Sequence, residues 1–145
     1  MPPHAALLCP VRGCAETLRW EPSQVVCAQG HHFDRAKSGY CNLLQVQERK
    51  AKRPGDSKAA VQARRRCLEG GLGDTLRKAI LARVATWNLP PGSLALDAGC
   101  GEGYFLAALC EAFGFEGWGV DISTPAVEAA ARTFPIARWV VANAD

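Results

Sequence analysis

Residues 93–104 have the sequence SLALDAGCGEGY, and this stretch decides the fold class. The apolar run from Ser93 to Asp97 follows a Pro-Pro-Gly turn and suits a buried strand. Glycines then occupy every second position. From Tyr104 to Phe113 the apolar residues recur at helical spacing, and Gly114 follows as a stop. The stretch therefore predicts a strand, a glycine turn and a helix in succession.

The alternation of strand and helix continues downstream. Residues 115–121 suit a second strand, a helix capped by Ser123 runs to about Thr133, and residues 137–141 suit a third strand. Upstream, residues 72–87 form an amphipathic pattern. This order predicts an α/β fold, namely the first half of a Rossmann-like, doubly wound parallel sheet. Three strands alone would leave one edge and one apolar face of that sheet uncovered.

The N-terminal region is rich in cysteine, and its spacing is C-x4-C-x12-C-x3-H. Two close pairs joined by a loop are typical of a structural zinc site, which predicts the ligands Cys9, Cys14, Cys27 and His31. His32 is an alternative to His31, and Cys41 is a less favoured fourth ligand. Reduced cysteines without metal, or a disulfide, remain the competing interpretation.

Composition and charge narrow the class of protein. The chain has 145 residues, 48% hydrophobic residues and a net charge of +3, which excludes wholesale disorder. No apolar run approaches the roughly 20 residues of a membrane span, and no secretory signal is recognisable, so we expect a cytoplasmic protein. We expect a zinc module over residues 1–47, a basic linker over 48–71 and the half-sheet over 72–145.

The glycine turn carries an acid before it and a second acid on the neighbouring strand. Asp121 ends the second strand, where a carboxylate can accept both hydroxyls of a ribose. The glycines allow a ligand close to the backbone at a helix start. Asp97 would repel a pyrophosphate but suits a cationic ligand with an amino group, such as S-adenosylmethionine. A tight turn without a ligand is the alternative.

The turn resembles motif I of the class I methyltransferases. By that resemblance Asp97 to Gly103 face the methionine part of S-adenosylmethionine, Asp121 holds the ribose and Asn143 lies near the adenine. The cofactor-binding residues that the resemblance implies are Asp97, Gly99, Cys100, Gly101, Glu102, Gly103, Tyr104, Asp121 and Asn143.

Several further motifs occur in one order along residues 9–145: the zinc pattern, Gly39–Leu44, Pro54–Ser57, Gln62–Arg65 and Leu96–Tyr104. Together they resemble the bacterial 23S ribosomal RNA guanine-N1 methyltransferases. This resemblance implies zinc on Cys9, Cys14, Cys27 and His31, S-adenosylmethionine as cofactor, and methylation of guanine N1 in a 23S rRNA hairpin that the zinc module helps to recognise.

The sequence departs from this family in three respects. The first cysteine pair encloses four residues where the family usually has two, and Gly73 stands where the family tends to place an aromatic cofactor contact. The family's domain also continues well beyond a third strand. No residue is nominated as a general base.

Two other functions stay open: a non-catalytic, zinc-dependent RNA-binding module, and a methyltransferase acting on a small molecule. A homodimer is also left open. Residues 48–66 carry eight Lys or Arg against two acids, which suits phosphate contact or a solvated linker. Trp20, Phe33 and Tyr40 suit either stacking on unpaired bases or the core of the module.

Overall fold

The computed structural model describes residues 7–48 and 54–144 of the chain. An N-terminal module holds a small antiparallel sheet of β1 (Arg19–Trp20), β2 (Gln24–Val26) and β3 (His32–Asp34). A second sheet has the order β4-β7-β6-β5 and is parallel throughout. Its strands are β4 (Cys41–Asn42), β5 (Leu94–Ala98), β6 (Glu116–Asp121) and β7 (Arg138–Val141).

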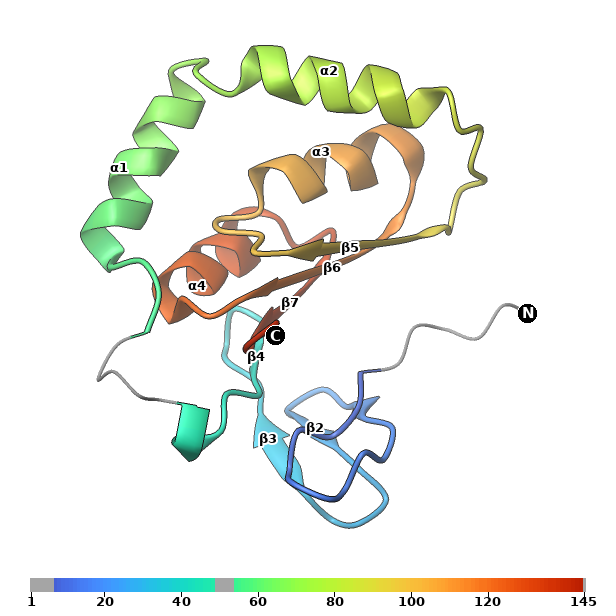
Figure 1. The fold of residues 1–145 in the computed structure, drawn as a ribbon, viewed down its shortest axis with the longest axis vertical. Helices are drawn as coiled ribbons and strands as arrows, with labels where there is room; N and C mark the ends of the chain where they lie inside the picture. The colour runs from blue at the N-terminus through green and yellow to red at the C-terminus, as the bar shows by residue number, and fades with distance from the viewer. Residues whose placement is uncertain (1–6, 49–53, 145) are drawn as a thin grey trace.

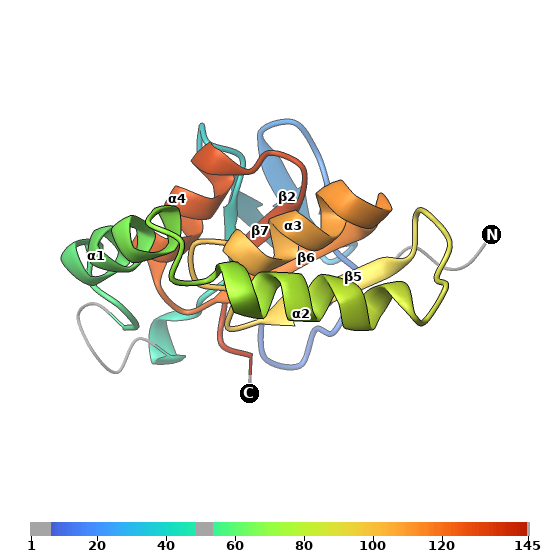
Figure 2. The ribbon, with the colours of Figure 1, turned by 90° about the horizontal axis from the view of Figure 1, so that it is seen from above.

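The helices are α1 (Lys58–Glu69), α2 (Asp74–Ala85), α3 (Tyr104–Phe113) and α4 (Thr124–Thr133), with a short 3-10 turn η1 (Val46–Glu48). β5, α3, β6, α4 and β7 follow one another as the sequence predicts, which confirms the first half of a doubly wound sheet. Figures 1 and 2 show α2 alongside α3, and α1 packs against α4.

Helix α1 lies within residues 48–71, the stretch expected to be a basic linker. It begins where the Ser57 hydroxyl accepts a hydrogen bond from the Ala60 N–H at 3.2 Å. Within α1 only Val61 is buried, so the helix offers almost no apolar periodicity to recognise. The bases Arg49, Lys50, Lys52 and Arg53 of this stretch lie outside the described residues.

The N-terminal module supplies a strand to the main sheet. β4 leaves the module and pairs with β7, with Cys41 opposite Val140 and Asn42 opposite Val141. The β7 edge is therefore covered. At the other edge, β5 pairs with β6 and has no second partner strand within residues 7–48 and 54–144, and Leu94 and Leu96 on it are exposed.

The two faces of the sheet bury separate cores. α3 and α4 cover one face, where Leu106, Val127 and Trp139 belong to one buried cluster. The two helices lie on the same face because both strand-to-strand crossovers are right-handed and follow one another in the same direction across the sheet. The zinc module covers the opposite face, where Trp118, Val120 and Val140 pack with residues of the module (Cys9, Leu18, Val25, Cys27, Cys41 and Leu43). The face that the sequence analysis left uncovered is thus filled by the module.

Among the helices of the described ranges, none has both the length and the apolar character required to cross a membrane.

Candidate functional site

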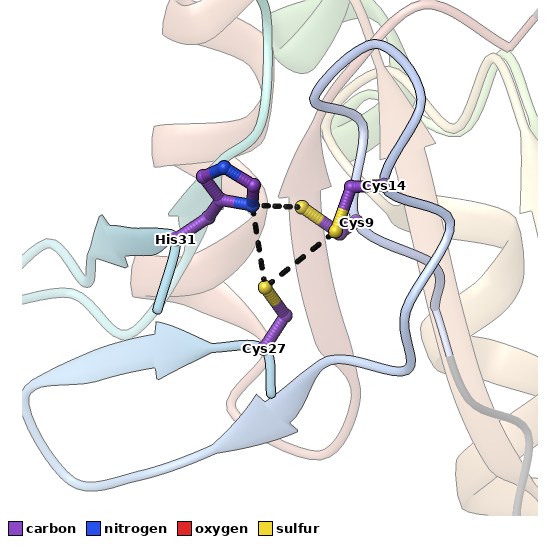
Figure 3. Close-up of side chains that lie close together, drawn as sticks. All are labelled: Cys9, Cys14, Cys27 and His31. Carbon is purple, nitrogen blue, oxygen red and sulfur yellow. Dashed lines mark hydrogen bonds between the residues drawn. The ribbon is translucent and has the colours of Figure 1, made fainter. Parts of the chain in front are cut away.

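The four expected zinc ligands lie together at the edge of the N-terminal module (Figure 3). Their ligand atoms are all within 4.8 Å of one another. His31 Nδ1 lies 3.5 Å from Cys9 Sγ and 3.4 Å from Cys27 Sγ, and Cys14 Sγ lies 3.8 Å from Cys27 Sγ. A tetrahedral zinc ion with Zn–S bonds of about 2.3 Å separates its sulfur ligands by roughly 3.8 Å. The donor set therefore fits a closed, structural zinc site.

Two short turns bring the ligands into this arrangement. The Cys14 N–H donates to the Val11 carbonyl at 2.9 Å, and the Gly30 N–H donates to the Cys27 carbonyl at 3.0 Å. Gly30 has a φ of +85°, which a side chain would disfavour. His32, the alternative ligand, is exposed on β3 and lies outside the cluster.

Cys41 also lies outside the cluster. It belongs to β4 and is buried where that strand pairs with β7. Of the aromatic residues considered for base stacking, Trp20 and Phe33 pack against the module's core and Tyr40 against the core on the helix face. The structure therefore favours the packing interpretation for these rings.

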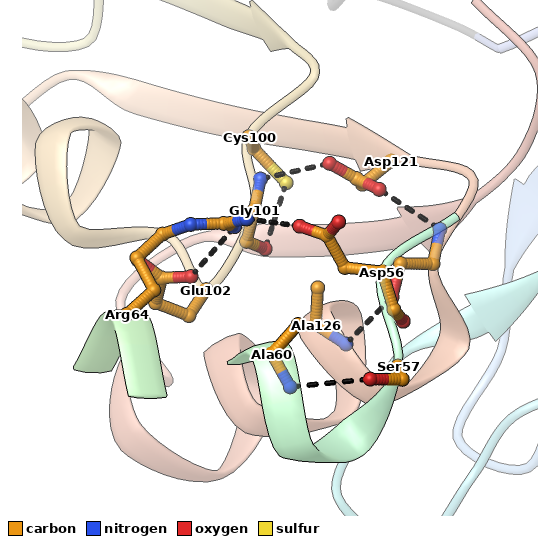
Figure 4. A network of polar contacts seen from close by, with 10 residues as sticks. Asp56, Ser57, Ala60, Arg64, Cys100, Gly101, Glu102, Asp121 and Ala126 are labelled. Carbon is orange, nitrogen blue, oxygen red and sulfur yellow. Dashed lines mark hydrogen bonds and ion pairs between the residues drawn. The ribbon is translucent and has the colours of Figure 1, made fainter. Parts of the chain in front are cut away.

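The glycine turn and the acid of the next strand meet at the carboxyl edge of the sheet (Figure 4). Asp121 Oδ2 accepts a hydrogen bond from the Gly101 N–H at 2.9 Å, and Oδ1 accepts one from the Ser123 N–H at 2.8 Å. The N–H groups of Gly99 and Cys100 donate to the Val120 carbonyl at 2.7 and 3.0 Å. Asp121 is thus aimed at the turn, and each carboxylate oxygen retains a lone pair for a further donor.

Two of the glycines have different roles. Gly99 has a φ of +84°, and no atom lies within 4 Å of the position that a Cβ would take, so the backbone is open to an approaching group. Gly103 has a φ of +82°, and a Cβ there would lie 2.8 Å from Trp139 Cζ3. Gly99 therefore provides access, whereas Gly103 allows the turn to pack on the sheet. The open backbone beside a carboxylate fits S-adenosylmethionine.

Burial at this edge raises the pKa of the Asp97 carboxyl, and the neighbouring Asp121 carboxylate raises it further. Both effects disfavour the ionised form of Asp97. A cationic ligand would favour that form again, so the pair of acids suits a sulfonium and an ammonium group. Burial, followed by the charges of Asp121 and Asp97, also raises the pKa of the Cys100 thiol. Cys100 packs in the core on the helix face, and its neutral thiol donates to the Gly101 carbonyl at 3.6 Å.

Glu102 and Tyr104 complete the helix start. Glu102 is only 7% exposed, and its Oε2 lies 3.3 Å from Arg64 Nη1. The Tyr104 hydroxyl donates to Asp74 Oδ1 at 2.9 Å. A Cβ on Gly73 would lie 2.9 Å from the Tyr104 ring, so Tyr104 occupies the neighbourhood in which an aromatic residue at 73 would sit. Asn143 follows β7 at the same edge and is exposed.

Sequence reasoning did not assign Asp56, Arg64 or Ser123 to this site. Asp56 and Arg64 form an ion pair, and the Ser123 hydroxyl donates to the Asp56 carbonyl at 2.7 Å. The Pro54–Ser57 and Gln62–Arg65 motifs pointed to these positions, but nothing in the sequence alone places them over the glycine turn.

Comparisons with known proteins agree with this geometry. The zinc-ribbon family described as "RlmA, N-terminal" matches residues 7–52, and a methyltransferase domain family matches residues 95–145. The 23S rRNA (guanine(748)-N(1))-methyltransferase of Streptomyces fradiae is 39% identical over 140 residues, which is 94% of this chain. The chain belongs to the family of 23S rRNA guanine-N1 methyltransferases.

A second relative, from Micromonospora griseorubida, is 35% identical over 159 residues and matches 97% of this chain. The two alignments cover 48% and 52% of the relatives, so the chain spans about half the length of each. Among solved structures, a TehB-like SAM-dependent methyltransferase from Corynebacterium glutamicum is 29% identical, covers 59% of this chain and 44% of its own, and has a TM-score of 0.47. The zinc-ribbon and methyltransferase matches confirm the two cofactors expected from the sequence, zinc and S-adenosylmethionine.

Proposed function

We propose that the protein to which this chain belongs methylates N1 of a guanine in a 23S rRNA hairpin. The observation that carries the proposal is the Asp121 carboxylate, which lies 2.9 Å from the Gly101 N–H of an open glycine turn in a chain with a zinc ribbon at its other end. Dinucleotide and methyl-donor sites share this edge of a parallel sheet, but the acid at Asp97 disfavours a pyrophosphate.

The reaction requires mainly that the protein align the methyl donor with guanine N1. S-adenosylmethionine supplies an electrophilic methyl group when bound. Guanine N1 carries a proton at neutral pH, and that proton must leave as the methyl group arrives. Holding the two reactants in line and excluding water account for much of the acceleration in such reactions. The base must also be unstacked to reach the donor.

We propose the following roles for the residues of the turn. Asp121 accepts hydrogen bonds from the ribose hydroxyls, and Asn143 lies on the adenine side. Asp97 offsets positive charge on the methionine side. The backbone around Gly99, Cys100, Gly101 and Gly103, together with Glu102 and Tyr104, lines the methionine side.

The zinc module is proposed to grip the RNA. Cys9, Cys14, Cys27 and His31 hold the metal, residues 1–47 form the module, and residues 72–145 carry the methyl-donor site. The bases of residues 48–71 other than Arg64 and Arg65 would contact phosphates, which gives RNA affinity a strong salt dependence. Ribosomal RNA as substrate implies a cytoplasmic enzyme. A homodimer stays a prediction.

Mass spectrometry of 23S rRNA digests tests the proposal. Cells that contain the intact gene should yield 1-methylguanosine at one hairpin position, and cells that express Asp121→Asn should not. Asn keeps the shape of the side chain, and circular dichroism checks that the variant folds. Glu111→Gln, at an exposed position on α3, serves as the matched control. Absence of the methyl mark, with RNA affinity intact, would instead favour the non-catalytic RNA-binding module.

A further inference from the structure

Arg64 lies directly over the glycine turn (Figure 4). Its Nη1 is 3.2 Å from the position that a Cβ would take on Gly101, and the same nitrogen donates to Glu102 Oε2 at 3.3 Å. Its Nη2 pairs with Asp56. Arg64 comes from α1, a helix that precedes the sheet, so a long-range contact brings a cation onto the methionine side of the proposed cofactor site.

Tertiary contacts fix Arg64 relative to Asp121. The loop before α1 is docked on Ser123, whose hydroxyl donates to the Asp56 carbonyl at 2.7 Å. A Cβ on Gly55 would lie 2.8 Å from the backbone of Ser123, so the loop and the start of α4 are in close contact. Because Ser123 follows Asp121 by two residues, the position of the guanidinium is linked to the strand end that carries the acid.

The charges around this cation suit a zwitterion. Asp56 and Glu102 are the two carboxylates that pair with the guanidinium, whereas Asp97 and Asp121 belong to β5 and β6 beside the glycine turn. The hydrogen bond that Arg64 donates to the Asp56 carboxylate raises the pKa of Arg64, so the group stays protonated. A guanidinium has five N–H donors in a fork that matches a carboxylate, and the bonds to Asp56 and Glu102 do not exhaust them. Asp56 is the more exposed of these two partners and the easier one to displace.

We propose that Arg64 binds the α-carboxylate of the methionine moiety of S-adenosylmethionine. The inference rests on the proposed function and adds a cofactor-binding residue to it. The ligand carboxylate joins or replaces Asp56 on the guanidinium, while Glu102 keeps the other end of the fork in place. The N-terminal helix α1 is thereby a part of the cofactor site.

Calorimetry on the intact protein tests the assignment with three ligands. S-adenosylmethionine has the carboxylate, decarboxylated S-adenosylmethionine lacks only that group, and 5′-methylthioadenosine lacks the whole amino-acid end together with the sulfonium charge. Arg64→Gln should weaken the affinity for S-adenosylmethionine about 10- to 100-fold, as expected for a lost charge-assisted hydrogen bond. The affinities for the other two ligands should stay within a few-fold of the wild-type values. Arg64→Lys should recover part of the loss.

Arg65→Gln is the matched control, because Arg65 is the next residue of α1 and pairs instead with Glu69 and Thr133. It should bind all three ligands as the wild type does. If Arg64→Gln leaves Glu102 unpaired and fails to fold, the double variant Arg64→Gln with Glu102→Gln removes both charges and carries the same expectation.

The outcomes separate the two proposals. Unchanged S-adenosylmethionine affinity in Arg64→Gln would overturn the inference. An equal loss for all three ligands would also overturn it, since Arg64 would then only support the turn. A wild-type protein that binds none of the three would overturn the proposed function itself.

Discussion

Trp118 of β6 meets Trp20 of the zinc module edge to face, with ring centroids 5.5 Å apart and an interplanar angle of 76°. Trp118 is 3% exposed, and the Arg138 guanidinium lies 4.9 Å from the centroid of its ring. Since β6 ends at Asp121, the strand that delivers this acid to the glycine turn is packed directly on the zinc module. The stability of the two sites is therefore coupled through the buried cluster to which this aromatic contact belongs.

Truncation of Trp118 should destabilise the protein. Trp118→Ala empties a buried site between module and sheet and should lower the free energy of unfolding by about 3–5 kcal/mol. The indole N–H of Trp118 has no hydrogen-bond partner within the described residues, so Trp118→Phe should cost only about 1 kcal/mol. Urea unfolding followed by circular dichroism measures both. Equal losses would contradict the packing argument.

Removal of zinc should loosen the sheet as well as the module. Cys9 and Cys27 share a buried cluster with Trp118 and Val120, so a strong chelator should lower Tm by about 10 °C or more and red-shift the tryptophan emission. Cys27→Ser should lose the metal in the same way. Cys67→Ser, at an exposed cysteine outside the cluster, should keep one zinc per chain by atomic absorption. A chelated protein with unchanged Tm would contradict the coupling.

The glycines of the turn should respond differently to a methyl group. Gly103→Ala adds both left-handed strain and overlap with Trp139, and should cost about 3 kcal/mol or more. Gly99→Ala adds the same strain without a clash and should cost about 1–2 kcal/mol. Affinity for S-adenosylmethionine should fall more in Gly99→Ala than in Gly103→Ala, because Gly99 faces the open side of the turn. Urea unfolding and calorimetry on the two variants test this contrast. Equal losses of stability would show that the Trp139 ring moves aside to make room for the methyl group, and would contradict the prediction.

Asp97 should make stability and cofactor affinity depend on pH in opposite directions. Its pKa is raised in the folded protein by burial and then by Asp121, so its contribution to stability is present below the ordinary carboxyl range, about pH 4, and is lost as pH rises through the raised value. A cationic ligand prefers ionised Asp97, so affinity should rise over the same window. Asp97→Asn should remove both slopes and raise stability at neutral pH. If the pH dependence of stability and of affinity is unchanged in Asp97→Asn, another titrating group is responsible for it.

Much of the main sheet could be predicted because its pattern is local. The apolar spacing from Tyr104 to Phe113 and the left-handed Gly114, with a φ of +67°, define α3 without help from the rest of the chain. The zinc ligands could likewise be predicted from spacing, since two turns close the site. The position of Asp121 at the glycine turn could be predicted because the carboxyl ends of parallel strands lie at the same edge of a sheet.

The other parts of the fold and of the site could not be predicted, because they depend on contacts between segments that are distant in the sequence. β4 has two residues and no pattern of its own, and its partner is defined only when β7 lies beside it. α1 looks like a linker because its single buried residue is Val61. Arg64 stands in a run of similar bases, and only the docking of Asp56 on Ser123 distinguishes it from Arg65 and Arg66.

The pairing of Cys41 with Val140 also bears on how the chain is made. The last strand of the zinc module leaves the ribosome early, but it has no parallel partner strand until β7 emerges, near the end of the described chain. Contacts of such sequence separation slow folding and leave an unpaired edge exposed in the meantime. Nascent chains should depend on chaperones during that interval, and a module exchanged between relatives should assemble only with a matching β7.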